Sequence, residues 1–245
     1  MKRNSPTISR RRFLAGLAGL GVGGAATSVC RPALARPGPL LTKAIPATGE
    51  QIPVIGMGSW LTFNVGSAKF LRDKRAEVLR AFFEAGGAVI DSSPMYGSSQ
   101  EVIGYCLKRI FDTTSLFSAT KVWTPFQWHG AGQMEKSAAL WGVDAFDLIQ
   151  VHNLLAWEKH LETLIKWKSQ GRVRYIGVTT SHGRRHRELE KIMTDQPIDF
   201  VQFTYNIVDR EAESRLLGLA AERRLAVIVN RPFQGGSLFD RFEDR

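Results

Sequence analysis

The chain has 245 residues, 44% of them hydrophobic, which is enough to bury one sizeable core. Two cysteines exclude a disulfide framework. A formal net charge of +10 would suit a nucleic-acid ligand, but residues 1–35 hold six basic and no acidic residues, which leaves 27 basic against 23 acidic residues elsewhere, a net +4. That balance is ordinary for a protein surface, so we expect no nucleic-acid partner.

Residues 1–35 are predicted to be an export signal outside the folded domain. Residues 9–14 (SRRRFL) match a twin-arginine motif, an apolar Gly/Ala-rich stretch follows at 13–29, and residues 33–35 (ALA) form a small-x-small cleavage site. The predicted partner is the twin-arginine export machinery and the predicted location is the periplasm. We expect no stable membrane span after cleavage, because glycines interrupt the apolar stretch. A retained anchor and a lipoprotein attached through Cys30 are the alternatives.

The rest of the chain alternates between strand-like and helix-like patterns. Residues 36–40 predict a linker and residues 41–52 a hairpin. The alternation that follows predicts parallel βα units in an α/β domain at 41–245. The expected strands are 54–58, 88–92, 116–122, 147–153, 173–179, 200–205 and 226–230. The expected helices are 69–84, 157–169, 187–193 and 215–224.

Three chemically reactive side chains follow these strands at one-unit intervals. Asp91, Lys121 and His152 each come directly after an apolar run, and they are separated by 30 and 31 residues. That spacing is about one strand plus one return helix, so we expect all three at the same ends of consecutive parallel strands. Active sites of (β/α)₈ barrels lie at that end. Tyr96 follows Asp91 by five residues and is expected at the same mouth.

Together these four side chains suit proton transfer to a substrate oxygen. A tyrosine hydroxyl, with a pKa near ~10, is a poor donor at neutral pH unless a cation stabilises its phenolate. We expect Lys121 to supply that cation, Asp91 to hold Lys121, and His152 to donate a hydrogen bond to a carbonyl oxygen. Each residue alone has an ordinary alternative: a core histidine, a capping aspartate or a surface lysine. Their registered spacing favours a site, and no metal centre is predicted.

Three motifs resemble the aldo-keto reductase family in order and spacing. They are residues 91–97 (Asp-Ser-Ser-Pro-Met-Tyr-Gly), 119–123 (Ala-Thr-Lys-Val-Trp) and 148–153 (Leu-Ile-Gln-Val-His-Asn), and the similarity extends from about 41 to 239. The resemblance implies a (β/α)₈ TIM-type barrel and an NAD(P)H-dependent oxidoreductase that transfers hydride between a nicotinamide and a small carbonyl or alcohol substrate. It implies Tyr96 as general acid, and NADP(H) in preference to NAD(H).

The resemblance also implies positions that bind substrate and the nicotinamide amide. Trp60 and Trp123 match residues that line the substrate pocket, although either tryptophan alone is more often a core residue. Thr179 and Gln202 match residues that bind the nicotinamide amide, and Thr180 replaces an asparagine there. The loop at 124–130 is expected either to shape the pocket or simply to pack.

The chain departs from the family pattern near its end. Asn230 replaces a tyrosine that stacks on the nicotinamide, and Arg231 is expected either to approach the pyrophosphate or to remain a solvated charge. Seven strands are expected, one fewer than a closed barrel, and in the family the eighth unit holds the adenosine 2′-phosphate. We therefore expect a domain incomplete at its C-terminus, by truncation or because another chain supplies the wall. The alternatives to a reductase are a non-catalytic exported binding or regulatory barrel and an inactive fragment.

Overall fold

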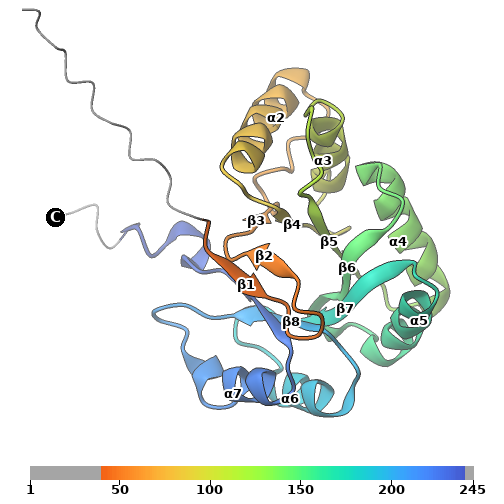
Figure 1. Cartoon of the computed structure of the whole chain (residues 1–245), viewed down its shortest axis with the longest axis vertical. Coiled ribbons are helices and arrows are strands. Elements are labelled where there is room, and N and C mark those ends of the chain that lie inside the picture. The colour runs from red at the N-terminus through yellow and green to blue at the C-terminus, as the bar shows by residue number, and fades with distance from the viewer. Residues whose placement is uncertain (1–39, 241–245) are drawn as a thin grey trace, which may run out of the picture. The chain divides into compact units, whose positions relative to one another are not determined.

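A curled parallel sheet forms the centre of the domain in the structure, a computed structural model that describes residues 40–240. Its seven strands follow one another in chain order, and the helices lie on its outer side (Figure 1). The predicted α/β fold with seven parallel strands is confirmed. The predicted signal peptide and all but the last residue of the predicted linker lie outside the described residues. The strands are β3 (Met57–Gly58), β4 (Val89–Asp91), β5 (Phe117–Val122), β6 (Phe146–Val151), β7 (Val173–Thr179), β8 (Phe200–Thr204) and β9 (Ala226–Asn230).

The four predicted helices are present, and two further helices were not predicted. The helices of the described residues are α2 (Lys69–Glu84), α3 (Ser99–Leu107), α4 (Gln127–Trp141), α5 (Trp157–Ser169), α6 (His186–Asp195) and α7 (Leu216–Glu222). Helix α4 includes part of the segment 124–130 that was expected to be a loop. Its buried face consists of Gly130, Met134, Ser137 and Trp141, so small and polar residues hide its apolar period.

Helix α3 lies close against α4 because a glycine faces the contact. A Cβ atom added to Gly104 would lie 1.8 Å from the backbone oxygen of Leu140. No larger side chain fits there without moving one helix. The contact therefore depends on a missing side chain, which carries no hydrophobic signal in the sequence.

A two-stranded hairpin closes the end of the sheet where the strands begin (Figure 1). Strands β1 (Thr42–Ala44) and β2 (Gln51–Pro53) pair antiparallel, as predicted. The hydroxyl of Tyr175 lies 2.8 Å from Thr48 Oγ1 and donates to Glu50 Oε2 at 2.6 Å, which ties the hairpin to β7. Val54, expected to start the first barrel strand, extends the hairpin instead through a backbone bond to Leu41 at 3.1 Å.

Strand residues alternate between two apolar cores. Outward side chains such as Ile90 and Val122 join the larger core beneath the helices. The inward cluster consists of Ile45 of the hairpin with Ala88, Val89, Phe117, Ala119, Leu148, Tyr175 and Phe200. This inward cluster fills the sheet interior nearest the hairpin, so the opposite end is left for polar residues. Within residues 40–240 no helix is long and apolar enough to cross a membrane.

Candidate active site

A layer of polar side chains lies above the inward apolar cluster, toward the carboxyl ends of the strands. Because side chains alternate with period 2, Asp91 shares the face of Val89 and Lys121 shares the face of Ala119. Gln150 follows Leu148 and Gln202 follows Phe200 in the same way. Strands β4, β5 and β6 are consecutive and parallel. The structure therefore brings Asp91, Lys121 and His152 to one end of the sheet, where the sequence spacing predicted them.

The ammonium group of Lys121 is held on three sides. Its Nζ donates to Asp91 Oδ1 at 2.8 Å, to Asp91 Oδ2 at 2.7 Å and to the Ser92 carbonyl at 2.9 Å. The Lys121 side chain is 1% exposed and that of Asp91 14%. Gln202 Nε2 also donates to Asp91 Oδ2, at 3.1 Å. A buried charge is tolerable only with such partners, so the pair is fixed in position and orientation.

The His152 imidazole is neutral, and one of its nitrogens contacts Ser93. Burial, followed by the charge of Lys121, lowers the pKa of His152 to about 3. Its Nδ1 lies 2.8 Å from Ser93 Oγ, which also accepts a hydrogen bond from the Met95 backbone N–H at 3.3 Å. The Ser93 hydroxyl can donate to Nδ1, which leaves the imidazole proton on Nε2, or accept from Nδ1–H in the other tautomer. Ser93 was not among the site residues that the sequence predicted.

Tyr96 lies against both His152 and Lys121. Its ring meets the His152 ring edge-on, with centroids 5.7 Å apart and an interplanar angle of 87°. Lys121 Nζ is 5.3 Å from the centre of the Tyr96 ring. Burial raises the pKa of Tyr96; the Lys121 charge lowers it and the Asp91 charge raises it, and the net direction is upward. Lys121 thus acts in the predicted direction, but burial outweighs it.

The segment after β6 differs from the predicted strand. The strand was expected to run to residue 153, yet β6 ends at Val151, and His152 begins a short 3₁₀ turn. Asn153, Leu154 and Ala156 all have positive φ, between 48° and 55°. Non-glycine residues rarely adopt that region. The chain therefore bends sharply after His152.

Two of the four predicted cofactor residues occupy the polar layer. The Thr179 hydroxyl accepts a hydrogen bond from the Asn153 backbone N–H at 3.1 Å. Gln202 is buried, and its amide joins Asp91 to Gln150. Thr180 is buried with an Oγ1 atom that has no partner in the described residues, and Gln150 Oε1 is likewise unpaired. Two buried polar atoms thus remain available beside Thr179 and Gln202.

The other two predicted cofactor residues have contacts within the protein. Asn230 Oδ1 accepts from Thr204 Oγ1 at 2.6 Å, and its Nδ2 donates to the Thr180 carbonyl at 2.8 Å. Its amide thereby joins β7, β8 and β9. Arg231 donates to His182 Nε2 at 2.9 Å and to Gln234 Oε1 at 3.2 Å. Both of these cofactor assignments stay predictions.

The two predicted substrate-lining tryptophans are at the surface. Trp60 is 52% exposed and Trp123 40% exposed. The alternative that either is a plain core residue is therefore wrong. The Trp123 backbone is held at both its N–H and its carbonyl by the Gln133 amide, at 2.6 and 3.0 Å. Within residues 40–240 no cluster of three side chains is arranged to hold a metal ion.

Comparisons with known proteins agree with this geometry. The sequence profile of the Aldo/keto reductase family matches residues 54–245. Aldo-keto reductase YhdN of Bacillus subtilis is 25% identical over 203 residues, which are 76% of this chain and 60% of YhdN. Aldo-keto reductase str7 of Strobilurus tenacellus is 28% identical over 206 residues, 77% of this chain and 60% of str7. The chain thus spans about 60% of the length of these relatives.

Solved structures share the fold. The thermostable aldo-keto reductase Tm1743, in complex with the inhibitor epalrestat, matches with a TM-score of 0.70 and 27% identity over 80% of this chain and 74% of Tm1743. A Klebsiella pneumoniae aldo/keto reductase in complex with NADP and acetate matches with a TM-score of 0.65 and 23% identity, over 80% of this chain and 71% of that one. The profile match over most of the sequence and the curled parallel sheet lead to one conclusion: the chain belongs to the aldo/keto reductase family.

Proposed function

We propose that this protein is an NADP(H)-dependent reductase of aldehydes or ketones. The observation that carries the proposal is the group formed by the buried Lys121–Asp91 pair, the adjacent Tyr96 and the neutral His152. Two hydrogen-bond donors of different strength, Tyr96 O–H and His152 Nε2–H, suit a carbonyl oxygen that gains negative charge during reduction. Solved relatives with NADP or NADPH bound support the choice of cofactor.

In this proposal each residue has a defined part in proton transfer. Tyr96 donates its proton to the substrate oxygen, and Lys121 stabilises the phenolate that is left. Asp91 keeps Lys121 charged and in place. His152 stays neutral and donates a hydrogen bond from Nε2 to the same oxygen. The nicotinamide, when bound, supplies the hydride.

The polar layer fits the carboxamide of a nicotinamide. A carboxamide offers one acceptor and two donors, and the layer leaves Gln150 Oε1 without a partner. The Thr179 hydroxyl accepts one bond from Asn153 and keeps its own proton to donate. Thr179 and Gln150 would hold the amide, and the unpaired Gln150 Oε1 would be satisfied on binding.

The proposal is tested by cofactor binding followed by turnover. NADPH is titrated into the full chain while tryptophan fluorescence is followed, and circular dichroism confirms that the chain is folded. We expect saturable binding, and then oxidation of NADPH at 340 nm with members of a panel of aldehydes and ketones. A folded chain that binds neither NADPH nor NADH contradicts the proposal.

The second candidate function is a non-catalytic barrel that binds or regulates. The observation in its favour is Asn230, whose amide is occupied between Thr204 and Thr180 where the family resemblance implies a stacking tyrosine. Saturable binding of a carbonyl compound without NADPH oxidation would favour this function.

We further propose export through the twin-arginine route, on the motif at 9–14. The full chain is expressed in a bacterium that has this route, and its periplasmic and cytoplasmic fractions are compared. Replacing Arg10 and Arg11 together by lysine should retain the protein in the cytoplasm. Equal periplasmic amounts of the parent and the variant would contradict the proposal.

A further inference from the structure

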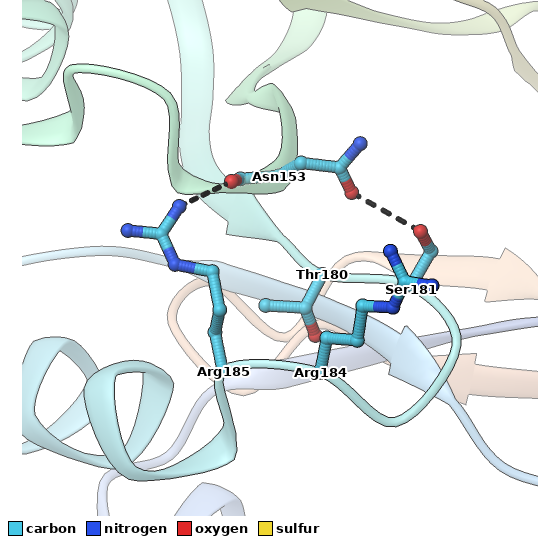
Figure 2. Close-up of a pocket in the computed structure, with 5 residues that line it drawn as sticks. All are labelled: Asn153, Thr180, Ser181, Arg184 and Arg185. Carbon is cyan, nitrogen blue, oxygen red and sulfur yellow. Dashed lines mark hydrogen bonds between the residues drawn. The ribbon is translucent and has the colours of Figure 1, made fainter.

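A pocket lined by polar side chains lies between the segment after β6 and the loop after β7, at the end of the sheet that holds the candidate active site. Its volume is about 210 Å³, and it is lined by Asn153, Thr180, Ser181, Arg184 and Arg185 (Figure 2). Asn153 directly follows His152, and Thr180 directly follows Thr179. The pocket therefore lies at the carboxyl ends of β6 and β7, the end of the sheet at which His152 and Thr179 also lie.

The two arginines of the pocket differ in whether a carboxylate neutralises their charge. Arg185 pairs with Glu188 at 2.6 and 2.7 Å. It also donates to the Asn153 carbonyl at 2.7 Å (Figure 2). Its charge is therefore balanced, and it fixes the segment after β6. Arg184 is exposed, and within residues 40–240 its side chain makes no ion pair or hydrogen bond. Arg184 is thus the cation of the pocket that is available to a ligand.

Charges of both signs lie around this loop: Arg184, Arg185 and Arg231 are positive, and Glu188, Asp209 and Glu211 are negative. The pKa of the neighbouring His182 is lowered, first by burial and then by the charges of Arg231 and Arg184. Only Asp209 acts in the opposite direction among the causes of that shift. Arg185 is paired with Glu188, so an anion that enters the pocket would be attracted by Arg184.

Among the other polar groups of the pocket, the Asn153 amide is oriented by a hydrogen bond, and the Thr180 hydroxyl lacks one. Ser181 Oγ donates to Asn153 Oδ1 at 3.2 Å, which orients the Asn153 amide (Figure 2). Thr180 is 2% exposed, and its hydroxyl has no partner in the described residues. A buried hydroxyl without a partner is uncommon because its desolvation is not repaid. A ligand with acceptor oxygens would provide the missing partner.

We propose that this pocket binds an anionic group of the substrate, a carboxylate or a phosphate, so that the carbonyl compound reduced at His152 and Tyr96 is an acid. The proposal rests on the proposed reductase function. The guanidinium of Arg184 can donate two parallel hydrogen bonds to two oxygens of a carboxylate or of a phosphate. We assign the anion to the substrate because the pocket lies at the end of the sheet that also holds His152 and Thr179.

The first experiment measures anion binding without turnover. Inorganic phosphate is titrated calorimetrically into the full chain and into two variants, Arg184→Gln and Arg187→Gln. Arg187 is the matched control because it is exposed on α6 and has no partner in the described residues. We expect Arg184→Gln to weaken phosphate binding by about tenfold or more, since a charge-assisted bond is lost, and Arg187→Gln to bind like the parent. If both variants lost phosphate affinity equally, or if neither lost any, the anion site would be overturned.

The second experiment separates the anion site from the reductase. The kcat/KM values for 4-carboxybenzaldehyde and 4-methylbenzaldehyde are compared, because the two compounds differ in charge and little in shape. We expect the parent chain to prefer the carboxylate, and Arg184→Gln to lose that preference while reducing the methyl compound unchanged. No preference in the parent would overturn the substrate assignment. Phosphate binding that depends on Arg184, in a chain that reduces no carbonyl, would refute the reductase and leave the anion site standing.

Discussion

Ser93 Oγ lies 2.8 Å from His152 Nδ1, although the two residues are 59 positions apart in the chain. We assign Ser93 the role of a positioning residue: if its hydroxyl donates to Nδ1, the proton of the neutral imidazole is left on Nε2. The chemistry assigned to His152 requires that tautomer, because only Nε2–H is then a donor to the substrate oxygen.

Ser93→Ala should therefore lower kcat/KM for carbonyl reduction by about tenfold, because one hydrogen bond no longer fixes the tautomer. Nitrogen NMR of the histidine ring should show a single Nε2–H tautomer in the parent and a mixture in the variant. Ser92→Ala is the matched control, because Ser92 is also buried and its hydroxyl has no partner in the described residues. A Ser93→Ala protein with an unchanged tautomer would remove the positioning role.

Asp91→Asn should destabilise the domain by about 3–5 kcal/mol, because it leaves the ammonium group of Lys121 buried without its counter-charge. Replacing both residues, Asp91→Asn with Lys121→Met, should recover part of the loss. Urea unfolding measures both changes. Glu77→Gln, which breaks the exposed pair with Lys74, is the control and should cost less than about 1 kcal/mol. A loss for Asp91→Asn no larger than that of the control would contradict the buried-pair account.

Stability should decline below neutral pH because of His152. Its folded pKa, about 3, is lower than the unfolded value near ~6.5, so the unfolded chain binds the proton first. The neutral ring stabilises the fold above ~6.5, and this contribution is lost as pH falls toward 3, by at most about 1.4 kcal/mol per pH unit. Urea midpoints at pH 7 and pH 4.5 measure the loss. His152→Gln should show a smaller decline; an identical decline would contradict the assignment.

Tyr96→Phe should lower turnover by about 100- to 10,000-fold, the usual contribution of a general acid, and leave NADPH affinity almost unchanged. Because burial holds the pKa of Tyr96 above its ordinary value, the hydroxyl remains protonated throughout the neutral range in the cofactor-free protein. Stopped-flow kinetics and fluorescence titration measure the two quantities. Loss of cofactor binding in this variant would mean that Tyr96 is structural.

Two glycines should respond oppositely to alanine. Gly104→Ala should destabilise the domain by several kcal/mol, since its Cβ would meet the Leu140 backbone oxygen of the next helix. Gly132→Ala, in α4, meets nothing within 4 Å and should stabilise the domain by about 0.5–1 kcal/mol through helix propensity. Thermal unfolding of the two variants gives the comparison; equal effects would contradict the packing of α3 against α4.

The sequence by itself determined the strand order and the end of the sheet at which the reactive residues lie. Strand pleating and the length of a βα unit are local properties, so the positions of Asp91, Lys121 and His152 in the chain were enough to place them together. The helices with regular apolar spacing, α2 and α5, were predicted with their bounds for the same reason.

Only the tertiary structure decided the contacts of Ser93 and of Asn230. Ser93 reaches His152, and Asn230 reaches Thr204 and Thr180, because the curvature of the sheet brings separate strand ends within hydrogen-bond distance. The pocket that contains Arg184 likewise forms only because the bend after His152 and the loop after β7 face each other. Such contacts depend on twist and register between distant segments, which no local pattern encodes.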